Sequence, residues 1–382
     1  MKIAFITLMG AIPWGGSEEL WYRTALYAKR QGHEVFCSVY RFDTIHPKIQ
    51  NLIDNKIEVD FRQRFNSGGN LFYKTKIYLQ NRITYLQDNY KKLLKFNPDV
   101  ILISQGGTYD IITHNKDLRE VLVNLNKPFF IVCHNNTENA SVLNPELIEL
   151  SKQIFKSAKK MFFVSEKNRN SAKRQLYDNL ENSTIVKNPL NLNKFEIQTF
   201  NKEEIINFAI VGILNPNHKG QDILFEILSK QEWQERNWIL NIYGNGAWEE
   251  YLKKLAIYFK IENKIFFRGH VSDIENLWQK NHILLMPSIG EGLPNTLLEA
   301  MICGRSAVVS DVGGNTEVIF ENQTGFIAEA PTVYSFGKAL KRAWENKDKW
   351  EQMGKNAHNF AIKFIDKEPD KTLLNLIIEK TL

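Results

Sequence analysis

Short apolar segments alternate with longer amphipathic ones along almost the whole chain. Short apolar runs between turn signals are typical of buried parallel strands, and the stretches between them repeat apolar residues at helical spacing. This alternation predicts an α/β fold in which helices cover both faces of parallel sheets. Strands are expected at 2–8, 33–40, 99–104, 128–134, 160–165, 183–187, 206–214, 239–244, 264–270, 282–288, 306–311 and 324–329.

The alternation pauses once, near the middle of the chain. The segment NPLNLNKF (188–195) is followed by the polar stretch QTFNKEEI, after which strand-like runs resume. We therefore expect two doubly wound, Rossmann-like domains, residues 1–195 and 196–364, joined by a linker. The last stretch, LLNLIIEKTL, has the apolar spacing of a helix that must pack on one of them.

Composition is ordinary for a globular protein of this length: 43% of the 382 residues are hydrophobic and 24% are charged. The net charge of +6 is uneven, because Lys and Arg exceed Asp and Glu only in residues 1–190. This half could attract a membrane surface, a lipid phosphate or a nucleotide, or be a solvated lysine-rich surface. No nucleic-acid-binding motif accompanies the charge, so no nucleic-acid partner is expected.

Two features bear on where the protein works. Residues 61–95 are basic with interleaved aromatics, which fits either an amphipathic helix on a membrane surface or an ordinary surface helix. No apolar run is long enough to span a membrane, and MKIAFITLMGAIPWGG is interpreted as a buried first strand rather than a signal peptide. The prediction is a cytoplasmic protein that could associate with the inner membrane surface.

The three cysteines, Cys37, Cys133 and Cys303, are far apart and form no CxxC pair. A disulfide framework or a zinc site is therefore not expected, and a reducing compartment suits the chain.

The strand at 282–288 is followed by a loop and a helix that form a candidate anion site. Ligands of doubly wound sheets bind beyond the carboxyl ends of the strands. Pro294 disfavours helix before it, so the next helix should begin at Asn295. Its unpaired N–H groups and partial positive charge favour phosphate, and the Thr296 hydroxyl could add a hydrogen bond.

Two glutamates flank this candidate phosphate site. Glu299 lies one helical turn in, where its carboxylate could accept hydrogen bonds from the 2′,3′-diol of a ribose. Glu291 lies on the loop, where it could face whatever the diphosphate carries. A single glutamate would most often be a solvated surface residue, but this local combination favours a site.

The spacing Glu291-x7-Glu299 resembles the E-x7-E motif of family 4 glycosyltransferases of the GT-B fold. The surrounding sequence EGLPNTLLEAM is also similar to that family. The resemblance continues in order through Gly304, VVSD, Gly313, Gly314, Glu317 and TGF.

The resemblance extends to other parts of residues 196–364, the donor side. In VGILNPNHKGQDIL, Lys219 matches the lysine that neutralises the diphosphate in the family. In FFRGHVSDIENLW, the backbone near His270 and Val271 matches the segment that faces the base. One departure is clear: the arginine that many relatives carry after the glycine at Gly212 is Ile213 here. His218 or Asn217 could substitute for it, or the grip could depend on Lys219 alone.

The first half resembles the same family at the loop with Gly15 and Gly16 and at His134. The resemblance implies that the loop approaches the ligand and the facing domain, and that His134 hydrogen-bonds the donor sugar and helps place the acceptor. The resemblance also implies that residues 365–382 form a helix that packs back on the first domain.

The implied reaction transfers a sugar, favoured as UDP-linked, to an acceptor hydroxyl with retention of configuration, in bacterial glycan, polysaccharide or glycolipid assembly. The transferred group would be a hexose or an N-acetylhexosamine. No metal site and no cofactor beyond the nucleoside diphosphate sugar is expected. The expected catalytic residues are His134, Lys219 and Glu291, and the donor-binding set is Gly15, Gly16, Gly212, Lys219, His270, Val271, Glu291, Gly292, Leu293, Pro294, Asn295, Thr296 and Glu299.

Three alternatives remain at this point. A nucleotide-sugar epimerase or a phosphorylase could share the two-domain shape, and a non-catalytic GT-B partner subunit could keep the fold without turnover. A dinucleotide-dependent oxidoreductase is disfavoured, because Gly244 and Gly246 are followed by Glu249 where the third glycine of G-x-G-x-x-G should be. The acceptor could be a lipid-linked saccharide, a growing polysaccharide, a protein or a small molecule.

Overall fold

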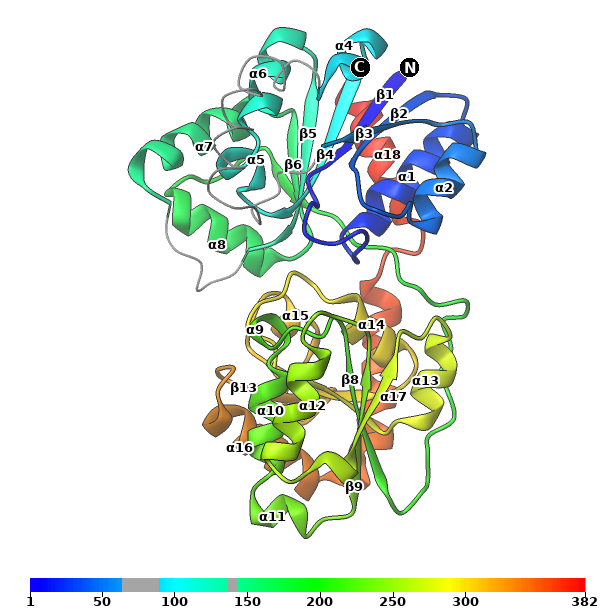
Figure 1. Cartoon of the computed structure of the whole chain (residues 1–382), viewed down its shortest axis with the longest axis vertical. Coiled ribbons are helices and arrows are strands. Elements are labelled where there is room, and N and C mark those ends of the chain that lie inside the picture. Colours follow the sequence, from blue (N-terminus) through cyan, green and yellow to red (C-terminus); the bar gives the residue numbers. More distant parts are fainter. Residues whose placement is uncertain (64–88, 137–142, 382) are drawn as a thin grey trace.

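A computed structural model describes residues 1–63, 89–136 and 143–381, which form two α/β domains (Figure 1). Each domain is built on one sheet, of seven strands in the first and six in the second, and all the pairings are parallel. The predicted fold class is therefore confirmed. Most of the predicted basic, aromatic helix at 61–95 lies outside the described residues.

The N-terminal sheet has the strand order β3-β2-β1-β4-β5-β6-β7. The order reverses between β1 and β4, and at such a switch point a crevice opens beyond the carboxyl ends of the strands. The strands are β1 (Lys2–Thr7), β2 (Glu34–Tyr40), β3 (Glu58–Arg62), β4 (Val100–Gly107), β5 (Phe129–Asn135), β6 (Lys160–Phe163) and β7 (Ser183–Ile185). The helices are α1 (Glu18–Arg30), α2 (Pro47–Asp54), α4 (Lys91–Phe96), α5 (Asp110–Thr113), α6 (Lys116–Leu125), α7 (Pro145–Ser157) and α8 (Glu166–Leu176).

The apolar pattern does not predict β3, because its sequence EVDFR alternates charged and apolar residues. That alternation suits a strand at the edge of a sheet, which has one free side. The charged residue at its end, Arg62, is nevertheless buried, and the contacts that hold it there are described below.

The C-terminal sheet has the order β10-β9-β8-β11-β12-β13, with its switch point between β8 and β11. The strands are β8 (Ile206–Val211), β9 (Trp238–Tyr243), β10 (Ile265–Gly269), β11 (Ile283–Met286), β12 (Ser306–Ser310) and β13 (Gly325–Ala328). The helices are α9 (Pro216–Lys219), α10 (Gln221–Leu228), α11 (Gln231–Gln234), α12 (Glu249–Tyr258), α13 (Ile274–Lys280), α14 (Asn295–Ile302), α15 (Asn315–Val318), α16 (Val333–Glu345), α17 (Trp350–Phe364) and α18 (Pro369–Glu379), with 3₁₀ turns at Glu262–Lys264 and Lys347–Lys349.

The chain passes between the domains twice. After α17, which lies on the C-terminal domain, α18 returns to the N-terminal domain and packs against α1 (Figure 1). Leu373, Leu374 and Ile377 of α18 are buried there in a core shared with β1 and β2. The two crossings touch, since the Lys187 ammonium lies 3.6 Å from the centre of the Phe364 ring.

None of the helices in the described part of the chain combines the length and the hydrophobicity that a membrane crossing requires. Among the same residues, no three His, Cys, Asp or Glu side chains are grouped in a way that could hold a metal ion.

Shortening Leu373 to alanine should destabilise the N-terminal domain, because the side chain is fully buried between α18 and the sheet. The expected loss in the free energy of unfolding is about 2–5 kcal/mol, measured by urea denaturation. The neighbouring exposed residue Asn375 is the control, and its replacement by alanine should change stability by less than about 0.5 kcal/mol. Equal stability of Leu373→Ala and the wild type would show that α18 does not support this domain.

Candidate active site

The loop after β11 and the start of α14 lie at the switch point of the C-terminal sheet. Pro294 is extended, with φ −72° and ψ 123°, and α14 begins at Asn295 as predicted. Leu293 and Pro294 are buried, whereas Thr296 is half-buried. The Asn295 side chain donates a hydrogen bond of 3.0 Å to the carbonyl of Pro189 in the linker, so the helix start is tied to the segment that joins the domains.

Lys219 and Glu291 meet beside this helix start. The Lys219 Nζ lies 2.5 Å from the Glu291 Oε1, and both side chains are largely buried. Gly220, at φ +63°, makes this possible: a Cβ there would lie 2.1 Å from the carbonyl oxygen of Pro287. The turn between α9 and α10 therefore packs directly on the loop that carries Glu291. A hydrogen bond from the Ile289 N–H to the His218 carbonyl also joins the two segments.

The structure bears on what replaces the missing arginine. The aliphatic part of the Lys219 side chain packs on Gly212. A Cβ built on that glycine would lie 3.1 Å from the Lys219 Cε. Burial lowers the pKa of His218, and the neighbouring Lys219 lowers it further, so this imidazole is neutral at pH 7. Asn217 carries no charge. Among the three candidates, Lys219 alone can supply a cation.

Glu299 points toward the linker between the domains. Its Oε1 accepts a hydrogen bond of 2.9 Å from the backbone N–H of Asn191, and the residue is 4% exposed. Burial raises the pKa of Glu299 to about 7. The hydrogen bond from Asn191 lowers this pKa, but by less than burial raises it. Glu299 is therefore a carboxyl group kept in a place where its ionised form is costly.

The segment expected to face the base follows β10. Gly269 ends the strand with φ +66°, after which His270 is exposed and Val271 half-buried. His270 faces the N-terminal domain closely enough to help lower the pKa of His46, which burial lowers most.

The N-terminal domain brings two of its predicted residues to the same region. A Cβ on Gly16 would lie 4.0 Å from the Asn295 Nδ2, so the glycine loop lies opposite the start of α14, while Gly15 packs on Ile12 and Met9 of its own loop. His134 is buried, and its Nε2 lies 3.2 Å from the Ser104 Oγ. Burial lowers the pKa of His134 to about 4, so it is neutral at pH 7.

The two domains touch where His134 meets the glutamate loop. A Cβ on Gly292 would lie 1.9 Å from the His134 carbonyl oxygen and 3.0 Å from Val164, which leaves room only for glycine. The Asn168 side chain also donates to the Glu291 carbonyl across the interface, at 3.4 Å. The His134 backbone thus lies against the loop that carries Glu291 and its partner Lys219, whereas the His134 side chain contacts Ser104 of its own domain.

One part of this interface was not predicted. The Lys167 backbone N–H donates to Glu317 at 2.8 Å, and its ammonium donates to the Asp311 carboxylate at 2.6 Å. Asp311 and Glu317 belong to segments that resemble the family, but nothing in the sequence indicates that they pair with the start of α8.

The comparisons with known proteins agree with this architecture. Residues 191–360 match the model of the family described as "Glycosyl transferases group 1". The structure of Anabaena Alr3699/HepE in complex with UDP is similar, with a TM-score of 0.73 at 16% identity over 99% of this chain and 100% of that one. The fold is GT-B.

Several relatives in sequence are named as glycosyltransferases. An uncharacterized glycosyltransferase of Haemophilus influenzae is 29% identical over 138 residues, 36% of this chain and 39% of that protein. The Escherichia coli UDP-Gal:alpha-D-GlcNAc-diphosphoundecaprenol alpha-1,3-galactosyltransferase is 28% identical over 126 residues, 31% of this chain and 32% of that one. The matches to the first relatives thus span about a third to a half of their length, and the epimerase alternative gains no support from them.

Replacing Glu299 with glutamine should stabilise the protein at pH 8 but not at pH 4. The folded-state pKa is raised above the unfolded value, so the wild type loses stability as the pH rises through about 7, whereas glutamine stays neutral. The expected gain at pH 8 is on the order of 3 kcal/mol, measured by denaturation at both pH values. The exposed Glu262 is the control, and Glu262→Gln should show no such pH-dependent gain. A pH-independent difference for Glu299→Gln would contradict the burial of an ionisable group.

Replacing Gly292 with alanine should loosen the contact between the domains, because the new methyl group must displace the His134 carbonyl by about 1 Å or more. Hydrogen exchange measured by mass spectrometry should become faster at residues 133–135 and 291–293. Gly337 of α16, where a Cβ would meet nothing closer than 3.7 Å, is the matched control. Unchanged exchange in Gly292→Ala would show that this close approach does not hold the domains together.

Proposed function

We propose that this protein is a glycosyltransferase that moves a sugar from a nucleoside diphosphate sugar to an acceptor hydroxyl. The observation that carries the proposal is the convergence of Lys219, Glu291 and the start of α14 at the switch point of one sheet, directly against His134 of the other domain. This arrangement offers a cation and backbone N–H groups to an anion between two domains. The family match of residues 191–360 supports the same activity.

In the proposed reaction, the bond between the sugar and the diphosphate breaks while negative charge builds on the leaving diphosphate. Lys219, the amides of the loop at 292–294 and the start of α14 would stabilise that charge, which is electrostatic catalysis at the point where charge develops. Because the pKa of His134 is lowered by burial, this side chain would act as a neutral hydrogen-bonding group toward the donor sugar. Contact between the domains would exclude water and limit hydrolysis.

We further infer that the configuration of the sugar is retained. The acceptor would attack from the face that the leaving group departs, and its proton would pass to the departing phosphate oxygen. No side-chain nucleophile and no metal ion is needed in this scheme. The resemblance of the E-x7-E segment to retaining enzymes supports the proposal.

We favour UDP as the nucleotide and a glycan or lipid-linked saccharide as the acceptor. The UDP bound to the Anabaena protein and the activity in the name of the Escherichia coli relative support this choice. Glu299 would bind the ribose diol with the carboxylate that now accepts from Asn191, and backbone at His270 and Val271 would face the base. The basic N-terminal half suits work at the cytoplasmic surface of the inner membrane beside an anionic lipid.

Loss of Lys219 should remove most of the activity. We expect Lys219→Ala to lower the kcat of sugar transfer by about 10²–10³, because the charge on the leaving diphosphate loses its only neighbouring cation among the three candidates. Transfer or release of UDP by the purified protein alone is the measurement. Lys254→Ala, an exposed lysine on α12, is the matched control and should leave the rate unchanged.

Glu299→Ala should weaken nucleotide binding. At pH 8, where a pKa of about 7 leaves Glu299 mostly ionised, losing a hydrogen bond to its carboxylate costs about 1.5–3 kcal/mol, equivalent to a roughly 10- to 150-fold weaker affinity. A thermal-shift titration with UDP measures this, since a ligand that binds the folded state raises its melting temperature. Wild-type rates in Lys219→Ala and wild-type UDP affinity in Glu299→Ala would together refute the site.

A further inference from the structure

A hollow lies in the N-terminal domain, at the carboxyl ends of β1, β2 and β3. It has a volume of about 270 Å³ and is lined by residues of the N-terminal domain. The lining residues Trp14 and Glu18 flank Gly16, on which a Cβ would lie 4.0 Å from the Asn295 Nδ2, so the hollow lies next to the contact between the domains. The hollow is near the lower size limit of small-molecule sites.

The floor of this pocket holds a buried carboxyl group. Glu18, the first residue of α1, is 4% exposed, and its Oε1 accepts a hydrogen bond of 3.0 Å from the Thr7 Oγ1. No ion pair to Glu18 is found within residues 1–63, 89–136 and 143–381. Burial raises its pKa to about 7, so near neutral pH it can either accept or donate a hydrogen bond.

A rigid network fixes the floor from behind. The buried guanidinium of Arg62 donates to the Thr7 carbonyl and, at 2.8 Å, to the Tyr90 hydroxyl. It also lies 4.3 Å from the centre of the Tyr40 ring, which lines the pocket. The positions of Thr7, Glu18 and Tyr40 are therefore set by packing, as a binding site requires.

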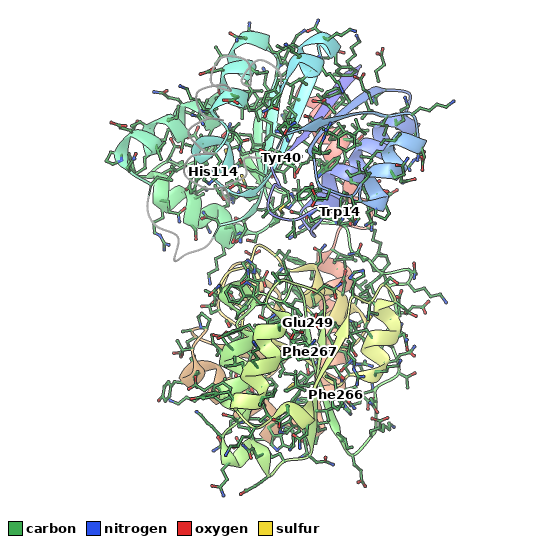
Figure 2. All side chains as sticks on the ribbon, in the orientation of Figure 1. Trp14, Tyr40, His114, Glu249, Phe266 and Phe267 are labelled. Carbon is green, nitrogen blue, oxygen red and sulfur yellow. The ribbon has the colours of Figure 1, made fainter. Side chains whose placement is uncertain are left out.

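The walls are mainly aromatic and apolar. The Trp14 ring stacks on His46, with centres 4.7 Å apart and planes at 5°. The Lys48 ammonium, which is paired with Glu19, lies 5.5 Å from the centre of the Trp14 ring. Figure 2 shows Trp14 at the edge of the N-terminal domain nearest the C-terminal domain, and Tyr40 deeper in the same domain. Ile45 contributes an apolar wall that is 52% exposed, while the charged Arg41 lies exposed at the rim. The lowered pKa of His46 keeps that wall neutral at pH 7.

We propose that this pocket binds the acceptor as an uncharged sugar ring, with the C–H face of the ring against the aromatic wall and a hydroxyl hydrogen-bonded to Glu18. A sugar ring combines an apolar face with a rim of hydroxyls, which is the combination that the walls and floor offer. A hydrocarbon chain would give the buried carboxyl no polar partner beyond the Thr7 hydroxyl, and a phosphate would meet a carboxyl group on the floor. Glu18 is then a specificity-determining residue. The inference rests on the proposed function.

The test uses saturation-transfer NMR on the full chain with the methyl glycosides of glucose, galactose, mannose and N-acetylglucosamine, each with and without UDP. At least one glycoside should show saturation transfer with the wild type. Its affinity should fall about 10-fold or more in Glu18→Ala, because a hydrogen bond to a buried carboxyl is lost. Glu58→Ala, an exposed carboxyl on β3, is the matched control and should bind the sugar as the wild type does. A retained UDP-induced thermal shift would show that Glu18→Ala is folded.

The outcomes separate this inference from the proposed function. UDP binding without any glycoside signal would overturn the pocket as a sugar site and leave the donor site standing. Equal glycoside affinity in Glu18→Ala and the wild type would overturn the assignment of Glu18. Competition by glycerol phosphate that disappears in Glu18→Ala would overturn the uncharged class of ligand. Absence of UDP binding by the wild type would instead count against the proposed function.

Discussion

The ion pair between Lys219 and Glu291 is the contact on which the candidate site depends. Taking both charges out of water is costly, and their attraction repays that cost only when the geometry is good. Here the distance is 2.5 Å, and the backbone packing of Gly220 on Pro287 holds the two loops in place. The pair keeps a lysine buried and oriented in the absence of any anion. An incoming diphosphate would then find its counter-charge already positioned, and would have to share it with Glu291.

Several ionisable side chains in the cleft are buried at a cost to the stability of the folded protein. Glu299 and Glu18 are carboxyl groups whose pKa burial raises to about 7, and His134 is an imidazole whose pKa burial lowers to about 4. A folded protein with no task for these groups would gain by replacing them with neutral side chains. Glu299 and His134 line the proposed donor site and Glu18 the proposed acceptor pocket. The cleft therefore holds buried ionisable groups on both of its sides, and the Nδ1 of His134 has no hydrogen-bond partner among the described residues, which is typical of sites that bind a ligand.

The sequence predicted the fold well because the evidence for it is local. Alternating apolar runs mark the strands, and Pro294 marks the start of α14 at Asn295. The edge strand β3 was missed because its charged residues interrupt the apolar run by which the other strands were predicted. The burial of Arg62 depends on contacts with Thr7 and Tyr90 from other parts of the chain. Most of the donor-site residues came from the resemblance to family 4 glycosyltransferases, and their roles stay predictions. The Lys167 contacts with Asp311 and Glu317, and the pocket above Glu18, could not be predicted, because both join segments that only the folded chain brings together.

The return of α18 to the first domain has a consequence for biosynthesis. Leu373, Leu374 and Ile377 complete a core whose other members include residues of α1, α2 and the strands β1, β2, β4, β5 and β6. Because a ribosome makes the chain from its amino end, that core stays incomplete until the whole second domain has been translated. Domains often fold one after another as they emerge, but the first domain here must wait for nearly the last helix, with apolar surface of α1 uncovered meanwhile. Chaperone binding to the nascent chain would be most useful over that interval.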